Sequence, residues 1–217
     1  FSRDVLTKLT NTQYMVLVVL EAPILALLLA FITRNSSITG GGAYVFRDNP
    51  NIPGFLFMSV IVALFLGLVI SAEEIFKDKK LLEREKFLNL SRSSYLNAKI
   101  SVLVIISAFH MMAYTLIGNQ ILEIQGMTLP YFFILFSTAC WANMVGLNIS
   151  SGFRSIVAIY ILVPLILVPQ LLFSGVVIDF RNMHQSVKSE KFVPVIGNLI
   201  TSRWTYEALV VTQFKKN

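Results

Sequence analysis

Cysteine and charged residues are both scarce in this sequence. Its 217 residues include a single cysteine, Cys140, and only 14% carry a charge, whereas 55% are hydrophobic. One cysteine excludes an internal disulfide framework and a thiolate metal cluster. With so few charged residues, the chain has too little polar surface to cover a water-soluble globule. The composition therefore indicates a membrane protein.

Recognisable catalytic motifs are also missing. The sequence contains no phosphate-binding G-x-x-x-x-G-K-[ST] loop, no G-x-S-x-G nucleophile motif and no H-E-x-x-H zinc motif. Its histidines, His110 and His184, fall in an apolar run and in a polar tail respectively, so they form no obvious metal site. We therefore expect no catalytic residue, no cofactor and no metal site within this chain.

The net charge of +6 could suggest a nucleic-acid partner. However, the basic residues lie beside apolar runs and form no stripe or arm of their own. Membrane topology explains their placement more economically. We expect the lipid bilayer, and not nucleic acid, to be the partner of this surface.

Long apolar runs dominate the chain. The runs that we expect to span the membrane cover residues 14–33, 54–71, 100–117, 129–149 and 156–178. At about 1.5 Å per residue, an α-helix of roughly 20 residues crosses the hydrocarbon core. Pro164 and Pro169 each remove a backbone hydrogen bond and predict a bend in the fifth span. The sequence thus predicts an all-α, polytopic transmembrane domain over residues 14–217.

A polar stretch, residues 72–99, separates the second span from the third. It contains seven basic and five acidic residues, and the positive-inside rule places such a loop in the cytoplasm. Counting spans then puts the N-terminus in the cytoplasm as well, in a multi-pass protein of the cell (inner) membrane. Because leucines and Phe87 are interleaved with the charges, the stretch favours a docking surface for a cytoplasmic partner over a solvated connector.

The two ends of the chain differ from the spans. Residues 1–13 gather apolar side chains on one side of a helix, which fits an amphipathic helix on the membrane, although a surface helix of a soluble domain would look the same. Residues 179–217 are expected outside, with a re-entrant or interfacial piece at 192–200 that is too short to cross. Since the first residue is Phe, we expect the numbering to begin inside a longer polypeptide.

Polar residues inside the predicted spans are candidates for a translocation path. The sharpest is an acid in the first span, because an ionisable group in the hydrocarbon core is costly and should face protein or water. Polar side chains at this depth also hydrogen-bond neighbouring helices, so a structural role is the alternative for each. The candidate path residues are Glu21, Asn143, Asn148, Gln170 and Phe173.

Three local patterns together are typical of one transporter family. An acid-rich stretch is followed by Arg-Glu and by a Tyr-x-x-Ala-Lys entry to the third span, at Glu74, Arg84, Glu85, Ser93, Tyr95, Ala98 and Lys99. L-F-S-G follows at 172–175, and S-R-W-T-Y-E-A-L at 202–209. The combination covers nearly the whole chain and resembles the membrane domain of type-two ABC exporters. The closest likeness is to the G subfamily (the white and pleiotropic-drug-resistance type), in the form of a bacterial half-transporter.

The resemblance implies that residues 74–90 form a coupling helix against a nucleotide-binding domain, fused upstream or separate, which would carry ATP and Mg. The residues expected to make this contact are Glu74, Leu81, Glu83, Arg84, Glu85 and Lys86. It also implies that residues 1–13 are a connecting helix and that two membrane domains, a second copy or a homologue, pair around a central path. The sequence departs from the family in lacking the sixth span, which we expect beyond residue 217.

Two functions follow from these observations. The first is a permease that couples ATP hydrolysis on the nucleotide-binding domain to export of a hydrophobic or amphiphilic substrate. The second is a non-transporting membrane anchor or assembly module that docks a cytosolic partner through residues 72–99. A membrane-embedded enzyme ranks last, because it would need ionisable residues clustered at one depth.

Overall fold

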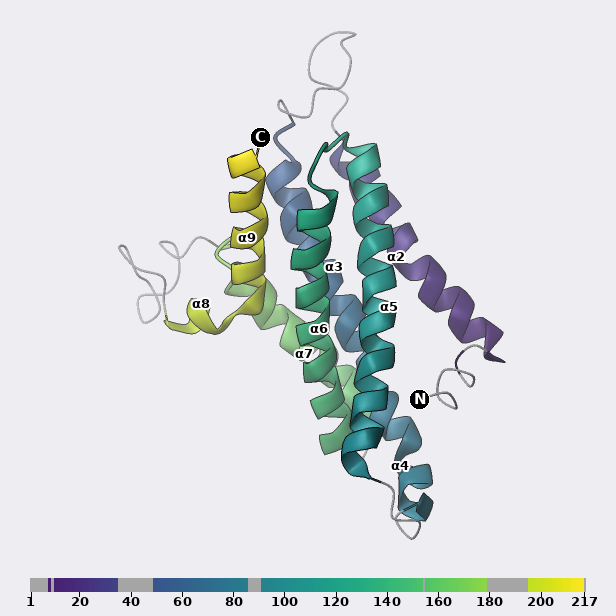
Figure 1. Ribbon diagram of the computed structural model, residues 1–217. Coiled ribbons are helices and arrows are strands. Elements are labelled where there is room, and N and C mark those ends of the chain that lie inside the picture. Colours follow the sequence, from purple (N-terminus) through teal and green to yellow (C-terminus); the bar gives the residue numbers. More distant parts are fainter. Residues whose placement is uncertain are drawn as a thin grey trace.

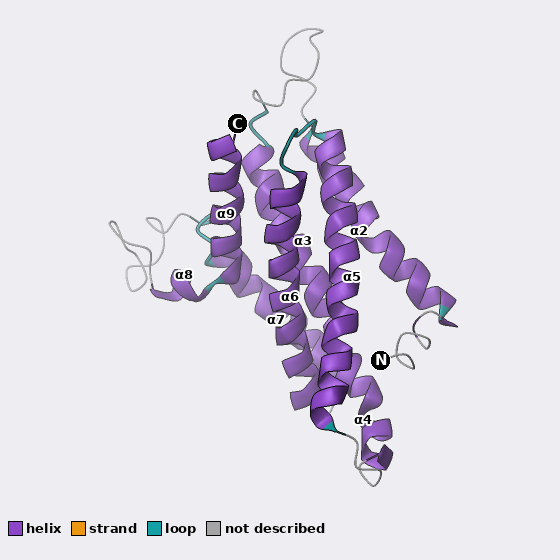
Figure 2. Cartoon of the chain, in the orientation of Figure 1, coloured by secondary structure: helices purple, strands orange, loops and turns teal. Residues whose placement is uncertain are grey.

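The computed structural model describes residues 8, 10–34, 49–85, 91–153, 155–178 and 195–216. Regular secondary structure within these residues is helical throughout, which confirms the predicted all-α class (Figure 2). The helices are α2 (Thr12–Thr33), α3 (Ile52–Ala72), α4 (Glu74–Glu85), α5 (Arg92–Ile121), α6 (Thr128–Gly152), α7 (Ile156–Leu172), α8 (Val195–Leu199) and α9 (Thr201–Lys216). Most of the predicted connecting helix at 1–13 lies outside the described residues.

The long helices form a bundle with an apolar exterior. Among the described residues, α2, α3, α5 and α6 are the four helices long and apolar enough to cross a membrane. They lie side by side in Figure 1, with α4 beyond one end of them, which we call the α4 end. Large apolar side chains point outward, such as Phe31 with 79% of its surface exposed. A contiguous surface of this kind is stable against lipid and not against water, so the bundle is a multi-pass membrane domain.

Two helix boundaries differ from the predicted spans. α5 begins at Arg92 instead of residue 100, because the Ser91 hydroxyl oxygen accepts a hydrogen bond from the Ser94 N–H and caps a polar first turn ahead of the apolar run. α7 ends at Leu172 instead of residue 178 and has only 17 residues. The turn after it contains Gly175 at a φ of 79°, a conformation that favours glycine.

The bundle is organised around a close contact between α3 and α6. A Cβ atom at Gly67 would stand 2.7 Å from the Ala139 carbonyl oxygen, and one at Gly146 would stand 1.9 Å from Ser71 Oγ. The two backbones therefore meet at positions where only glycine fits without a shift. The paired positions advance together along both helices, so α3 and α6 run parallel toward the α4 end.

Helix α2 packs against α5 through small residues. Ala22, Ala26 and Ala30 are fully buried along one face of α2. On α5 the fully buried His110 places Nε2 2.6 Å from the Val18 carbonyl oxygen. A hydrogen bond to that carbonyl requires the proton on Nε2, so His110 acts as a donor that joins the two helices.

Helix α7 follows the first part of the fifth predicted span, and α9 begins beside the end of α7. The Ser202 N–H donates to Gln170 Oε1 at 3.0 Å, and the Ser202 hydroxyl donates to the Gln170 carbonyl oxygen at 2.6 Å. This exchange satisfies backbone groups at both helix ends, which a break inside hydrocarbon requires. From there α9 runs away from the α4 end along α3 and α6, and near its last turn Gln213 accepts a hydrogen bond from the Tyr131 hydroxyl.

The α3–α6 contact generates a stability prediction. Gly67→Ala should destabilise the protein, because the added methyl group would overlap the Ala139 carbonyl oxygen, and overpacking of this kind costs about 1–3 kcal/mol. Gly54→Ala is the matched control in the same helix, because nothing lies within 4 Å of a Cβ there. Thermal unfolding in detergent should give a lower midpoint for Gly67→Ala than for Gly54→Ala. Equal midpoints would refute the close contact.

Candidate functional site

Hydrogen bonds from backbone N–H groups of α4 connect this helix to α6 at the α4 end. The first N–H groups of a helix have no partner within the helix. In α4, the N–H groups of Ile75 and Phe76 both donate to Ser150 Oγ, near the end of α6, at 3.0 and 2.9 Å. One turn later Lys79 Nζ donates at 2.5 Å to the carbonyl oxygen of Phe153, the C-cap residue of α6. Residues at the end of α6 and in the first turns of α4 thus supply hydrogen-bond partners for each other's backbone groups.

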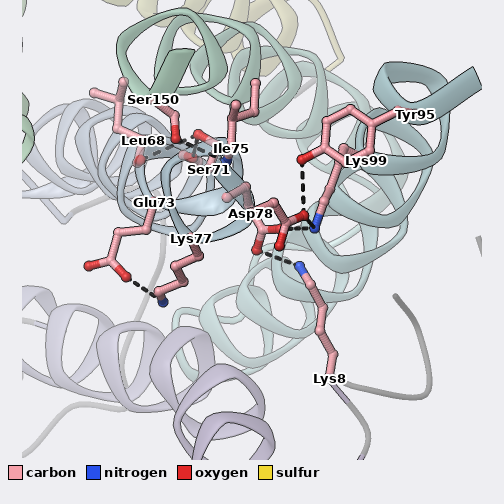
Figure 3. A network of polar contacts seen from close by, with 12 residues as sticks. Lys8, Leu68, Ser71, Glu73, Ile75, Lys77, Asp78, Tyr95, Lys99 and Ser150 are labelled. Carbon is pink, nitrogen blue, oxygen red and sulfur yellow. Dashed lines mark hydrogen bonds and ion pairs between the residues drawn. The ribbon is translucent and has the colours of Figure 1, made fainter. Parts of the chain in front are cut away.

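A network of charges connects the same helix to α5 and to the N-terminal segment (Figure 3). Glu74 receives Lys8 Nζ on one carboxylate oxygen at 2.6 Å and Lys99 Nζ on the other at 3.1 Å. Lys99 also pairs with Asp78 at 2.8 Å, and Asp78 accepts a hydrogen bond from the Tyr95 hydroxyl at 2.9 Å. We call these five residues, together with the Ser150 and Lys79 contacts, the α4 joint.

Burial makes the network more costly to break than a surface ion pair. The side chains of Lys99 and Glu74 are 6% and 10% exposed, and Lys8 is 13% exposed. Exposed ion pairs contribute about 0–1 kcal/mol, whereas removing one partner of a buried pair costs roughly 3–5 kcal/mol, since the other charge stays buried alone. The joint therefore holds α4 in one orientation relative to α5, α6 and Lys8.

The residues of the α4 joint link segments of the chain to one another and include no reacting group. Among the residues that the structure describes, no set of three or more His, Cys, Asp or Glu side chains could hold a metal ion. Its charges are paired with one another, and its polar contacts link separate segments of the chain. Geometry of this kind suits a mechanical connection between a polar helix and a membrane bundle.

Comparison with known proteins shows the family to which this sequence belongs. The profile described as ABC-2 type transporter matches residues 1–214. The chain belongs to the ABC-2 type transporter family. Among curated proteins none matches it. As a member of this family with several apolar helices, the chain is the membrane-spanning permease component of an ABC transporter.

Within this ABC-2 chain, the residues expected to contact a nucleotide-binding domain divide into two groups. Glu74 lies at the centre of the α4 joint. Leu81, Glu83, Arg84 and Glu85 lie in the helical turns of α4 farther from the bundle, with side chains outside the described part. Lys86 and the rest of the predicted coupling helix to residue 90 lie outside the described residues. For both groups, contact with a nucleotide-binding domain stays a prediction.

Sequence reasoning overlooked part of the joint. Asp78 follows Glu74 by four residues, and this spacing puts both carboxylates on one face of a helix, toward the lysine of the Tyr-x-x-Ala-Lys pattern. The spacing was therefore a usable signal for Tyr95 and Lys99 as partners. No sequence signal pointed to Ser150, because its contact depends on how α6 packs beside α4.

The five candidate path residues are spread over α2, α6 and α7 and its C-cap, and within the described chain no two of them are hydrogen-bonded to each other. Asn143 is fully buried and donates to Ser107 Oγ at 2.8 Å, which joins α6 to α5. Asn148 is exposed and donates to its own helix. Glu21 and Phe173 are partly buried, and Gln170 forms the α7–α9 exchange described above. A role in translocation stays a prediction for all five.

The joint generates the next prediction. Glu74→Gln should lower stability by roughly 3 kcal/mol, because it leaves the buried Lys8 ammonium without its carboxylate. Glu123→Gln is the matched control, since its pair with Arg34 is 50% exposed on the Glu side and should contribute less than about 1 kcal/mol. Denaturant unfolding monitored by tryptophan fluorescence would measure both. A loss for Glu74→Gln no larger than for Glu123→Gln would contradict the assignment.

Proposed function

We propose that this permease couples ATP hydrolysis on a nucleotide-binding domain to export of a hydrophobic or amphiphilic substrate, with α4 as the coupling helix. The observation that carries the proposal is the α4 joint. A helix that only connected two spans would need no buried ion pairs to α5 and Lys8 and no reciprocal caps with α6. Because the joint fixes α4 to several segments, a push on α4 is passed to the bundle instead of being absorbed by a loop.

The proposal assigns separate tasks to the two halves of α4. The first turns, with Glu74, hold the helix to the bundle. The later turns, with the predicted contact residues Leu81, Glu83, Arg84 and Glu85, extend away from the bundle. Together with Lys86 they would meet the nucleotide-binding domain, which binds ATP and Mg. The resemblance to the G subfamily supports pairing with a second membrane domain, and the positive balance of residues 72–99 supports a cytoplasmic α4 end and N-terminus in the inner membrane.

Orientation can be tested with engineered cysteines in a Cys140→Ala background. Lys77 and Glu123 have exposed side chains, 60% and 50%, and lie at opposite ends of the bundle. In intact cells a membrane-impermeant maleimide should label Glu123→Cys and spare Lys77→Cys until the membrane is permeabilised. Labelling of Lys77→Cys alone in intact cells would invert the topology and refute the cytoplasmic placement of α4.

Coupling can be tested by exchanging charges on α4 in the full-length transporter. The double variant Arg84→Glu with Glu85→Arg keeps the net charge and should reduce substrate-stimulated ATPase and transport, while basal ATPase and membrane insertion stay near wild type. Coupling free energies of about 1–3 kcal/mol predict a loss of roughly five- to a hundredfold.

The matched control for that experiment is Arg34→Glu with Glu123→Arg, which exchanges an exposed pair at the opposite end. It should leave transport unchanged. Undiminished coupling in the α4 double variant would count against the permease proposal. A full-length protein that binds its cytosolic partner but never shows substrate-stimulated ATPase would support the anchor alternative instead.

A further inference from the structure

A groove lies between the turn after α7 and one face of α9. The turn contributes Ser174, Gly175 and Val176, and α9 contributes residues at helical spacing, including Arg203 and Glu207. Its volume is about 250 Å³, below the ~300–1,000 Å³ of sites that enclose a whole drug-sized molecule. The groove is therefore of a size to hold a polar headgroup and not an entire amphiphile.

The charged pair of this groove lies near the middle of the bundle. Thr205, two residues after Arg203, shares a 2.9 Å hydrogen bond with Thr138. Thr138 is ten residues into the 25-residue helix α6, which places it about 15 Å from that helix end. An arginine and a glutamate at such a depth are costly in a membrane protein and mark a functional position by default.

The arginine is held in place while its acidic neighbour is held loosely. The Arg203 guanidinium donates to Asn198 Oδ1 at 2.5 Å and lies 4.6 Å from the centre of the Trp204 ring. Its distance to Glu207 Oε2 is 3.4 Å, and the Glu207 side chain is 52% exposed. A guanidinium fixed by other partners and a carboxylate free to turn away can each receive a group of opposite charge.

The rest of the groove is apolar. Val176 and Val211 are 36% and 44% exposed beside the charged pair, and Val210 and Tyr206 complete this wall. A ligand that satisfied only the charges would leave these side chains uncovered. The lining therefore suits a molecule in which a charged headgroup is joined directly to hydrocarbon.

We propose that this groove binds the zwitterionic headgroup of a phospholipid, with the phosphate on Arg203 and the ammonium on Glu207. Guanidinium and phosphate form paired, charge-assisted hydrogen bonds, and a carboxylate accepts from an ammonium. A headgroup reaches the middle of a bundle only in passage, so the ligand is the exported amphiphile. In this respect the inference rests on the proposed function and adds the class of its substrate.

Binding is measured on the purified full-length transporter in detergent, without nucleotide, by isothermal titration calorimetry with three short-chain probes. These are phosphatidylethanolamine, phosphatidylglycerol, which lacks the ammonium, and diacylglycerol, which lacks both charges. We expect wild type to bind phosphatidylethanolamine most tightly. Arg203→Gln should weaken both phospholipids by about tenfold or more, and Glu207→Gln should weaken phosphatidylethanolamine alone, since each removes one charge-assisted contact.

Asn198→Ala tests whether the loss in Arg203→Gln comes from a missing headgroup contact or from a groove that has lost its internal support. This variant removes the contact that holds Arg203 to α8 and keeps both charges. It should weaken phosphatidylethanolamine less than Arg203→Gln does. The proposal is overturned if Asn198→Ala causes the same loss, if Glu207→Gln has no effect, or if diacylglycerol binds as well as phosphatidylethanolamine. The charge exchange at Arg84 and Glu85 should leave binding intact, so a failure of coupling and a failure of this site are distinguishable.

Discussion

The close approach of α3 and α6 is the constraint on which the rest of the structure depends. With Gly67 against the Ala139 carbonyl and Gly146 against Ser71, the two backbones are fixed in register along the bundle. That register brings the end of α6 beside the start of α4, where Ser150 reaches two N–H groups. Hydrocarbon gives no hydrophobic reason for helices to associate, so close packing and hydrogen bonds must do so. The α4 joint therefore depends on glycines that lie one to two helical turns before it, Gly67 in α3 and Gly146 in α6.

The apolar runs were sufficient to predict the all-α class and the approximate course of the long helices, because hydrocarbon imposes a minimum length and composition on each. The apolar runs did not predict where the fifth helix, α7, ends. Hydropathy continues past Leu172 to Ile178, so no loss of apolar character marks the break after α7. Helix α9, which follows that break, carries Arg203, Trp204 and Glu207, and this polar composition predicted an external segment. Only its tertiary partners, Gln170 and Thr138, show it to be part of the bundle.

The candidate site was predictable to the extent that it is local. Glu74 and Lys99, the lysine of the Tyr-x-x-Ala-Lys pattern, stood out in the sequence, whereas Asp78 was missed although it follows Glu74 by four residues. Which oxygen meets which ammonium depends on the angle between α4 and α5, which no local pattern in the sequence reports. Contacts across long sequence separations, such as Lys8 to Glu74 and Ser150 to Ile75, carry no local signature. For the same reason the sequence gives no sign of the bonds between Gln170 and Ser202.

Helix α6 connects the two polar regions of the bundle. Near its end Ser150 caps α4, and nearer its start Thr138 bonds to Thr205 of α9, beside the groove at Arg203. A long helix that is packed tightly on α3 moves as a body, since its contacts change in discrete steps and not by continuous bending. Under the proposed function, a displacement of α4 would therefore displace α6 and, through Thr138, the α9 wall of the groove. The broken fifth span makes that wall a separate piece, which can shift without unfolding a membrane-spanning helix.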